Sequence, residues 1–456
     1  MRKNSKIHPS PLHILSPGQM MVAGFVFLIL LGAVLLTSPL SSANGTSTSF
    51  IDALFTATSA VCVTGLVVVD TSIHWSIFGK VVIILLIQVG GLGFMTLGTL
   101  VALIFGKKIN LRQRILIKEA LNQDDLSGSV KLIKKVLKYT LVIEGLGALL
   151  LSFAFIPQFG FLKGIAYSIF TSISSFCNAG FDLMGSISGE YSSIVSYYNR
   201  PLIVFTISAL IILGGIGFPV IINIVNKRHL KKLSLNSKMA LVTTAILIVG
   251  GFLMIFLGEV GHALHGMTLW EKFQVAFFQS VTTRTAGYAT IDLTQFREST
   301  LFVMIILMFI GASPASTGGG IKTTTAAVLF IAVKSFIKNE NEITVQHKRI
   351  NVFTFRKALG IFIIAISIAV LGVYLLSITQ DPKHFDILSC SFEVSSALAT
   401  VGLSLAGSYH LNGVGKVIIM VLMFAGRVGS LTIFTAFISE NKRKRVRYPE
   451  AKVLVG

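Results

Sequence analysis

The sequence predicts an all-α membrane protein in which four pseudo-symmetric helix–pore loop–helix repeats surround a central pore. Three observations lead to this fold class. The chain of 456 residues is 53% hydrophobic and only 13% charged, roughly half the charge of a typical soluble domain. Its long uncharged runs match the ~20 residues that a helix needs to cross ~30 Å of hydrocarbon. A short motif that ends in glycine also recurs four times along the chain.

The recurring motif begins with phenylalanine and ends with glycine ten residues later. It reads FTATSAVCVTG, FTSISSFCNAG, FFQSVTTRTAG and FEVSSALATVG, and its glycines are Gly65, Gly180, Gly287 and Gly402. A chain that repeats a short helix and a glycine turn four times can surround an axis. The motif therefore predicts an ion pore with a filter made of backbone carbonyls.

Each repeat is expected to contain a long helix, a short helix and a second long helix. The first helices are expected at 19–40, 137–156, 238–258 and 356–378, the short ones at 50–62, 163–176, 269–283 and 385–398, and the second ones at 79–105, 200–226, 299–337 and 412–439. At ~1.5 Å per residue the short helices cross only half a bilayer, so they must turn back inside it. The expected total is eight transmembrane helices and four re-entrant pore helices.

These elements group into four pore repeats at 19–105, 136–226, 237–337 and 354–439, flanked by tails at 1–18 and 440–456. No extramembrane stretch is long enough to build a core of its own. The first apolar run is too long for the hydrophobic part of a signal peptide, so it is expected to remain as the first span.

The net charge of +20 follows the expected topology. Most of the 39 Lys and Arg fall in segments 1–20, 106–138, 226–238, 334–357 and 441–452, which alternate with loops nearly free of basic residues. Basic segments stay on the cytoplasmic side, so both termini are expected to be cytoplasmic in a plasma (inner) membrane protein. Membrane lipids are therefore the expected surroundings, and no nucleic-acid partner is expected.

The residues before each repeated glycine are expected to bind the ion. A dehydrated cation needs oxygen ligands, and glycine gives the backbone angles that let successive carbonyls face an axis. The expected filter residues are Val63, Thr64, Gly65, Asn178, Ala179, Gly180, Thr285, Ala286, Gly287, Thr400, Val401 and Gly402. None is acidic, which favours a monovalent cation over a divalent one. The filter also lacks the TVGYG run of tetrameric potassium channels, so fewer ion sites are expected.

The second helix of the third repeat is expected to be interrupted. Residues 299–337 are nearly twice the length of one span, and the run GASPASTGGG inside them breaks helices. We expect a mobile gate on the axis, formed by Gly311, Ala312, Ser313, Pro314, Ala315, Ser316, Thr317, Gly318, Gly319 and Gly320, with Lys322 and Arg427 beside it. A phosphate-binding loop is not expected, because Ile321 separates the last glycine from the lysine and no strand precedes it.

Arg427 lies in an apolar helix, at the position in the fourth repeat that matches this loop. An intramembrane cation indicates a functional site. Arg427 could hold the loop through its carbonyls or form a positive barrier to cations, and Lys322 could do either. The alternative is an ion pair with Glu393 or Glu144. Arg284, within the third filter segment, is expected to point away from the axis and to brace the filter.

Two other classes of membrane protein are alternatives to an ion pore. A secondary transporter of a small organic solute can also be built from repeats around a broken helix, but four parallel repeats with four re-entrant glycines argue against it. An intramembrane enzyme would need paired acids, a Ser/His pair or metal ligands. No such set occurs at convincing spacing, and Cys62, Cys177 and Cys390 lack metal-binding patterns.

At this point the chain resembles the Trk/Ktr/HKT superfamily of potassium transporters, and within it the membrane subunit of a Ktr system. The resemblance covers residues 15–456 and is carried by the four single-glycine filter segments, the GASPASTGGGIKTTT helix and the Arg427 helix. The short N-terminal segment, with no extra helix pair before the first repeat, favours Ktr over Trk.

The resemblance implies several properties. They include channel-like potassium uptake with sodium as an activator, a homodimer with one pore per subunit, and a cytosolic ring of nucleotide-binding regulatory subunits of the KtrA type. The loop at 311–320 would be the gate, and the basic segments 106–138, 226–238 and 334–357 would dock the ring. All four filter glycines are present, which favours potassium over sodium. No organic cofactor is expected in this chain.

Overall fold

The structure, a computed structural model, describes residues 17–93, 129–227, 229–340 and 342–429. Within these ranges the regular structure is helical except for one hairpin, β1 (Thr344–Val345) paired with β2 (Lys348–Arg349). The helical fold class is therefore confirmed. Most of both terminal tails and of the basic segments 106–138 and 441–452 lie outside the described residues.

In the part of the chain that the structure describes, four single helices are long and apolar enough to cross a membrane, and they coincide with the predicted first helices of the repeats. They are α1 (Pro17–Thr37), α6 (Ser129–Phe159), α11 (Leu235–Glu259) and α15 (Val352–Thr379). Large apolar side chains on their outer faces, such as Phe27, Phe153 and Leu257, are more than half exposed. Exposed apolar side chains along helices of this length indicate contact with lipid, so the chain is an integral membrane protein.

A short and largely buried helix follows each long one. These helices are α2 (Phe50–Cys62), α7 (Phe161–Phe176), α12 (Leu269–Thr282) and α16 (Ile387–Ala399). Local sequence sets three of their starts: the side chains of Ser49 and Asp386 accept hydrogen bonds from backbone N–H groups of the first turn, and Thr268 forms a capping box with Glu271. All four agree with the predicted short helices to within two residues.

The second helix ends earlier than predicted in the first, second and fourth repeats, and in the third it ends at the predicted interruption. These helices are α3 (Ile77–Leu92), α9 (Pro201–Gly215), α13 (Glu298–Phe309) and α17 (Gly413–Val428). In three of them the break coincides with a glycine at positive φ, namely Gly93, Gly217 and Gly429. Such glycines end helices because they adopt left-handed angles without a steric cost. Residues 94–105 and 430–439 of the predicted helices at 79–105 and 412–439 lie outside the described residues.

The prediction of one continuous helix over 200–226 was wrong. Helix α9 is followed by α10 (Phe218–Lys227), and the two axes differ in direction by 95°. The interruption predicted in the third repeat is present: loop 311–320 separates α13 from α14 (Thr323–Ile337). Further short turns lie in the connections, namely α8 (Gly185–Ser188), η2 (Pro39–Ser41), η3 (Val195–Tyr197), η4 (Leu230–Lys232), η5 (Leu293–Gln295) and η6 (Ser408–His410).

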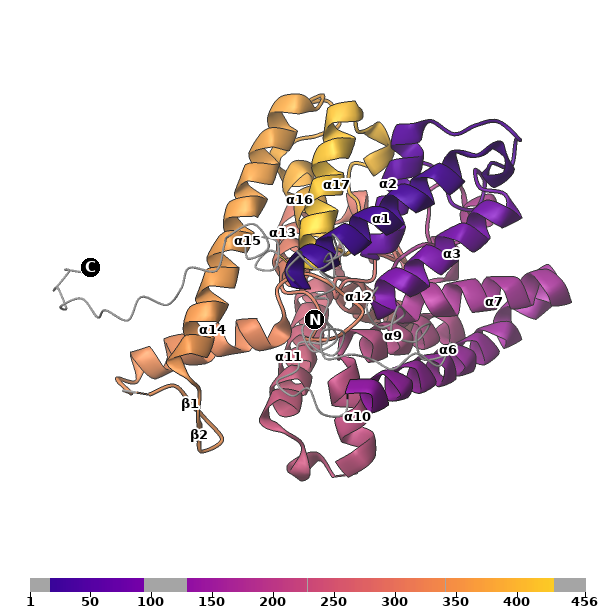
Figure 1. The fold of residues 1–456 in the computed structure, drawn as a ribbon. Helices are drawn as coiled ribbons and strands as arrows, with labels where there is room; N and C mark the ends of the chain where they lie inside the picture. Colours follow the sequence, from indigo (N-terminus) through magenta and orange to yellow (C-terminus); the bar gives the residue numbers. More distant parts are fainter. Residues whose placement is uncertain (1–16, 94–128, 228, 341, 430–456) are drawn as a thin grey trace, which may run out of the picture.

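Contacts between the repeats follow one cyclic order. The second helix of each repeat packs on the short helix of the next, in the pairs α3 with α7, α9 with α12, α13 with α16, and α17 with α2. The last pair brings the end of the chain back to its beginning, so yellow α17 lies beside indigo α2 in Figure 1. The four repeats therefore form a closed ring, with the short helices inside it.

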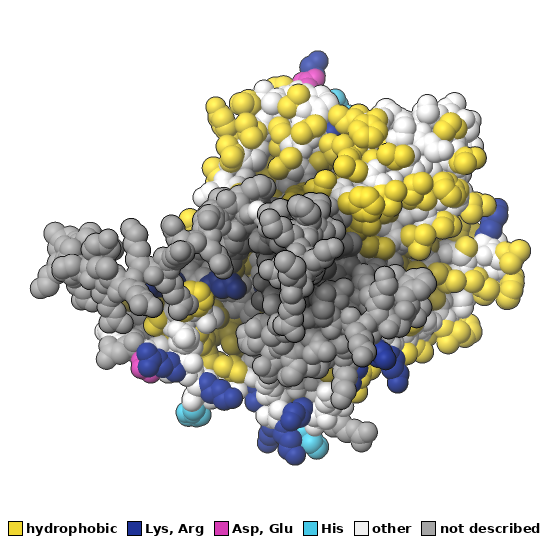
Figure 2. Space-filling model, in the orientation of Figure 1, with side chains coloured by type: hydrophobic (Ala, Val, Ile, Leu, Met, Phe, Trp, Pro, Cys, Tyr) yellow, Lys and Arg dark blue, Asp and Glu magenta, His cyan; other side chains and the backbone are white. Residues whose placement is uncertain are grey.

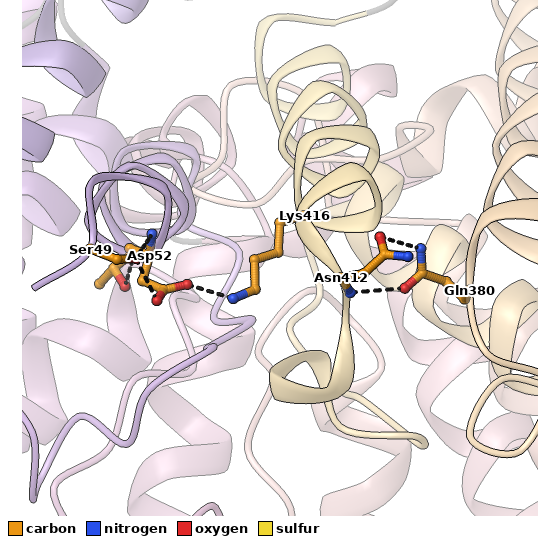
Figure 3. A network of polar contacts seen from close by, with 6 residues as sticks. Ser49, Asp52, Gln380, Asn412 and Lys416 are labelled. Atoms are coloured by element: carbon orange, nitrogen blue, oxygen red, sulfur yellow. Dashed lines mark hydrogen bonds and ion pairs between the residues drawn. The ribbon is translucent and has the colours of Figure 1, made fainter.

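An ion pair and a pair of side-chain amides stabilise the contact between α17 and α2 that closes this ring (Figure 3). Lys416 Nζ, in the first turn of α17, lies 2.5 Å from Asp52 Oδ1, in the first turn of α2. Ser49 Oγ donates to the other carboxylate oxygen at 2.7 Å. Gln380 Nε2, at the end of α15, donates to Asn412 Oδ1 at 2.9 Å. Helix α17 is thereby tied to the first repeat and to its own long helix.

The surface separates apolar from basic side chains. Hydrophobic side chains cover the face over α1, α3 and α7, whereas Lys and Arg gather at the lower edge, near the hairpin and η4 (Figure 2). The exposed basic residues at this edge include Lys231, Lys232, Lys338, Lys348 and Arg349. An apolar belt with a basic end is the expected surface of a membrane protein that follows the positive-inside rule.

Candidate functional site

The four predicted filter segments, residues 63–65, 178–180, 285–287 and 400–402, share one backbone conformation. In each, the first residue and the glycine both have positive φ, and the middle residue does not. For the first residues φ lies between 53° and 67°, an unusual angle for Val63, Thr285 and Thr400. Four copies of a strained conformation at equivalent positions indicate a functional geometry.

The four glycines pack against one another in cyclic order. A Cβ atom on Gly65 would lie closer than 3.0 Å to the carbonyl oxygen of Ala179, in the next repeat. The same relationship holds for the other three pairs, which are Gly180 with Ala286, Gly287 with Val401, and Gly402 with Thr64. Each glycine therefore has no room for a side chain, and the four segments form a ring of touching backbones.

The backbone N–H groups of the middle filter residues donate to carbonyl oxygens of the preceding short helices. The N–H groups of Thr64 and Val401 donate to the carbonyls of Ser59 and Ser396 at 2.8 Å, and that of Ala179 makes the equivalent bond to Ser174. The N–H of Ala286 donates to the carbonyl of Thr282, four positions back instead of five, at 3.0 Å. Within the described residues, no carbonyl oxygen of the filter segments accepts a hydrogen bond. Buried carbonyls without donors are rare, so this ring is rich in oxygen atoms that are free to bind a ligand.

Hydroxyl side chains on the short helices hold this conformation, and the sequence prediction missed them. Ser59 Oγ accepts from the N–H of Gly65, and Ser396 Oγ accepts from the N–H of Gly402, both at 3.0 Å. In the other two repeats, Ser174 Oγ and Thr282 Oγ1 donate to the carbonyls that follow the glycine, both at 2.7 Å. A hydroxyl residue five or six positions before each glycine was the signal that could have revealed them.

Three of the second helices carry a glycine where they pack against the short helix of the same repeat. A Cβ atom on Gly90, Gly214 or Gly426 would lie closer than 3.0 Å to a carbonyl oxygen at the end of the short helix of the same repeat. Those carbonyls belong to Val61, Phe176 and Leu398. The glycines let each second helix approach the filter segment closely, which accounts for their matched positions in three repeats.

Loop 311–320 is bonded to the break between α9 and α10. The N–H of Ser313 donates to the carbonyl of Gly215 at 2.9 Å, and the N–H of Phe218 donates to the carbonyl of Ala315 at 3.0 Å. The N–H of Thr317 also donates to the carbonyl of Gly214, at 3.3 Å. Two broken helices from adjacent repeats therefore satisfy each other's exposed backbone groups, as irregular backbone at membrane depth requires.

Loop 311–320 is folded back on itself by its own backbone and by Lys322. The N–H of Ala312 donates to the carbonyl of Gly319 at 3.2 Å. Lys322 Nζ donates to the carbonyls of Gly318 at 2.7 Å and of Gly319 at 3.4 Å. Ser313 Oγ and Thr323 Oγ1 lie 2.9 Å apart and join the two ends of the loop.

Arg427 joins the loop to the first repeat. Its Nη1 donates to the carbonyl of Thr317, in the loop, and its Nη2 donates to the carbonyls of Gly90 and Gly91. Of the alternatives raised by the sequence, contact with loop carbonyls is the one observed. No ion pair joins Arg427 to Glu144 or Glu393 within the described residues.

The other buried charged residues lie in separate surroundings. Glu144 accepts from Gln88 Nε2 at 3.2 Å, and Glu393 accepts from Ser408 Oγ at 3.1 Å. Arg284 is almost fully buried, and its Nε and Nη1 have no hydrogen-bond partner among the residues that the structure describes. Its predicted bracing role is therefore not seen as hydrogen bonds from those two atoms. No group of His, Cys, Asp and Glu suited to a metal ion occurs among the described residues.

Comparison with known proteins decides the family. Residues 11–446 match the family described as TrkH, cation transport protein. The chain belongs to the TrkH family, within the Trk/Ktr superfamily. It is similar to the potassium/sodium uptake protein NtpJ of Enterococcus hirae, with 43% identity over 97% of this chain and 98% of that protein.

Two further matches agree with this assignment to the TrkH family. The Ktr system potassium uptake protein B of Bacillus subtilis is 39% identical over 97% of both chains. The crystal structure of the potassium transporter TrkH from Vibrio parahaemolyticus superposes with a TM-score of 0.72, at 18% identity, over 96% of this chain and 87% of that one. TrkH proteins are cation transporters and not enzymes. The hypothesis of an intramembrane enzyme is therefore excluded.

Proposed function

We propose that this TrkH-family protein is the membrane subunit of a potassium uptake system and that K⁺ crosses it through the ring of four filter segments. The observation that carries the proposal is the closed ring of glycine turns whose carbonyl oxygens accept no hydrogen bond within the described residues. Such oxygens can replace the hydration shell of a cation. The names of the similar proteins, which include potassium uptake and potassium/sodium uptake, support the choice of ion.

The chemistry of the ring favours a monovalent ion. The atoms that it offers to an ion are neutral carbonyl oxygens, and no filter segment contains an acidic side chain. Divalent cations are held by carboxylates in most protein sites. Glycine in all four segments keeps the ring symmetric, and we expect this symmetry to favour potassium over sodium.

The short helices are the pore helices of the proposal. They contain 13, 16, 14 and 13 residues, which at ~1.5 Å per residue is about two thirds of the hydrocarbon thickness. They would enter the membrane and return through the filter segments, while the first and second helices of the repeats supply eight spans. In the second and third repeats the second helices would cross as broken spans, with their breaks beside the ends of the pore helices.

Loop 311–320 is the proposed gate. It lies against the filter residues Thr285 and Thr400 and is held by Lys322 and Arg427. It contains no helical turn and it is rich in glycine, so a change of conformation would cost less there than within a helix. Loop displacement would open the path between the filter and the cytoplasm.

The protein is proposed to act at the plasma membrane with both termini in the cytoplasm. We further propose a homodimer, docking of a cytosolic nucleotide-binding ring of the KtrA type, and activation by sodium. The exposed basic residues near the hairpin and η4 lie on the side where such a ring would bind. The names of two relatives place them in Ktr systems, which have several components.

Uptake in a host that lacks its own potassium uptake systems tests the proposal. Cells producing the chain, with and without a regulatory subunit, should accumulate potassium and grow at low external potassium. Gly65→Ser and Gly402→Ser variants, present in equal amounts in the membrane, should lose the preference for potassium over sodium. Absence of potassium flux in both conditions, with the protein folded in the membrane, would favour a carrier of organic solutes instead.

A further inference from the structure

We propose that side chains of the filter segments hold the gate loop directly, so that ion selectivity and gate opening are coupled through Asn178 and Thr400. The proposal rests on the function proposed above and adds the residues that link the filter to the gate. It makes Asn178, Thr400 and Thr317 positioning residues, because they act on the ion path through the backbone that they hold.

Asn178 connects three parts of the molecule. Its Nδ2 donates to the carbonyl of Arg284, the residue directly before the third filter segment, at 3.2 Å, and to Thr285 Oγ1, within that segment, at 3.3 Å. Its Oδ1 accepts from Thr317 Oγ1, in the gate loop, at 3.2 Å. The Thr317 hydroxyl is also 3.2 Å from the carbonyl of Phe176, at the end of α7. One amide therefore spans two filter segments and the loop, and all of these groups are buried.

Thr400 makes a second link from the fourth repeat. Its Oγ1 accepts from the N–H of Gly319, in the loop, at 3.0 Å. The loop glycines leave no space around these contacts: a Cβ atom on Gly318 would collide with Thr285, and one on Gly319 would collide with Thr400. The loop is thus packed against filter side chains from two repeats, Thr285 and Thr400, and is hydrogen-bonded to the second of them.

The first filter segment takes no part in this network. Its residue equivalent to Asn178 and Thr400 is Val63, whose side chain has no polar group, and the buried hydroxyl of Thr64 has no hydrogen-bond partner among the described residues. The coupling is therefore asymmetric and involves the second, third and fourth segments. On its other side, the loop is held by Arg427, which donates to the Thr317 carbonyl and also to the carbonyls of Gly90 and Gly91.

Burial makes these bonds difficult to break one at a time. A buried polar group that loses its partner costs more than the net value of the bond, because water does not replace the partner. Movement of the loop would leave Asn178 Oδ1, the Thr317 hydroxyl and the Gly319 N–H unpaired together. We infer that the side chains of Asn178 and Thr400 then reorient, and with them the strained backbone whose carbonyls form the filter.

The experiment measures potassium and sodium fluxes of the full-length protein in vesicles of phosphatidylethanolamine and phosphatidylglycerol. Thr400→Val and Thr317→Val remove one hydroxyl each and keep the side-chain shape. Asn178→Gly removes the amide and tolerates the positive φ of 60° at this position. Thr140→Val is the matched control, because the Thr140 hydroxyl is equally buried in α6 but has no partner.

We expect each network variant to raise the potassium flux and to lower the K⁺/Na⁺ permeability ratio by roughly two- to tenfold, the worth of one net hydrogen bond. Asn178→Gly and Thr317→Val combined should change the ratio no more than the larger single effect, because both remove the same bond. Thr140→Val should change neither quantity.

Two results would overturn the coupling. One is a raised flux with an unchanged permeability ratio, which would mean that the loop opens without affecting the filter. The other is an unchanged flux and ratio in Thr400→Val, which preserves shape and so stays informative if Asn178→Gly fails to fold. In both cases the native protein still carries potassium selectively, so the proposed function stands. No potassium flux through the native protein would remove the proposed function and the coupling together.

Discussion

Gly402 lies against the carbonyl oxygen of Thr64, so the last filter segment of the chain meets the first. This contact completes a cycle in which the glycine of each segment abuts the carbonyl that precedes the next glycine. Each glycine also has φ between 70° and 96°. Steric room and backbone angle therefore exclude a side chain at the same four positions, for two independent physical reasons.

The first prediction concerns this ring. Gly402→Ser should lower the K⁺/Na⁺ permeability ratio by about tenfold, the equivalent of the ~1–2 kcal/mol that left-handed angles cost a residue with a Cβ, with further loss from displacement of the Thr64 carbonyl. Gly360→Ser is the control, because Gly360 lies in α15 with open space around it and no positive φ. Flux measurements with both ions would decide, and equal ratios for the two variants would remove Gly402 from the filter.

The sequence predicted the parts of this fold that repeat. Hydrophobic length located the four long helices, and the recurrence of phenylalanine and glycine located the short ones with small errors. Both signals are local, since span length is set by the bilayer and a glycine turn by backbone sterics. The predicted filter residues are also the ones that the structure brings together, although their binding of ions stays a prediction.

The breaks in the second helices were harder to predict, because they depend on a partner. Residues 201–226 contain no charged residue, yet the chain turns by 95° after Gly215. The carbonyls of Gly214 and Gly215, freed by this turn, accept N–H groups of loop 311–320, from another repeat. The sequence of residues 201–226 alone contains no information on that loop. The carbonyls bound by Arg427 could not be predicted for the same reason, because they belong to other repeats.

The second prediction separates two roles of Arg427. If the guanidinium tethers the loop, both Arg427→Ala and Arg427→Lys should raise the potassium flux, because an ammonium group cannot span the carbonyls of Thr317 and Gly90 as a planar fork does. If a positive charge alone blocked cations, Arg427→Lys would keep the native flux. We expect the first pattern, with an increase of about tenfold or more for the loss of charged hydrogen bonds. Flux per folded protein in vesicles is the measurement.

The third prediction is a dependence on pH through Asp182, two residues after Gly180 in the loop between α7 and α9. Burial raises the pKa of its carboxyl to about 6, and the nearby charge of Asp70 adds to the increase. The carboxyl is therefore ionised above this pH and neutral below it. Two residues from Gly180, it lies within about 7 Å of that glycine, close enough for its charge to attract a cation.

Potassium flux should accordingly fall by about threefold between pH 7.5 and pH 5, the effect of one unit charge at roughly 7 Å in water. Asp182→Asn should have a low flux at both pH values and a flat profile over this range. Potassium flux as a function of external pH, in native and variant protein, is the measurement. A native profile that stays flat, or an Asp182→Asn profile that retains the step, would assign the pH dependence elsewhere.

The fourth prediction concerns the ion pair that closes the ring of repeats. The side chains of Lys416 and Asp52 are 16% and 22% exposed, whereas those of the pair Arg349 and Glu342 are 62% and 48% exposed. Water screens the second pair and leaves it with ~0–1 kcal/mol. The first should contribute about 1.5–3 kcal/mol, as hydrogen bonds to charged groups do when they are partly buried.

Lys416→Met should therefore lower the apparent Tm of the protein in detergent by several times more than Arg349→Met, its matched control. Reversing the pair with Asp52→Lys and Lys416→Asp should restore only part of the loss. Asp52 lies in the first turn of α2, where the helix dipole favours a carboxylate, and it accepts a hydrogen bond from Ser49 that a lysine cannot accept. A reversed pair as stable as the native one would show that charge attraction alone closes the ring. Equal Tm values for Lys416→Met and Arg349→Met would show that helix packing closes it without the ion pair.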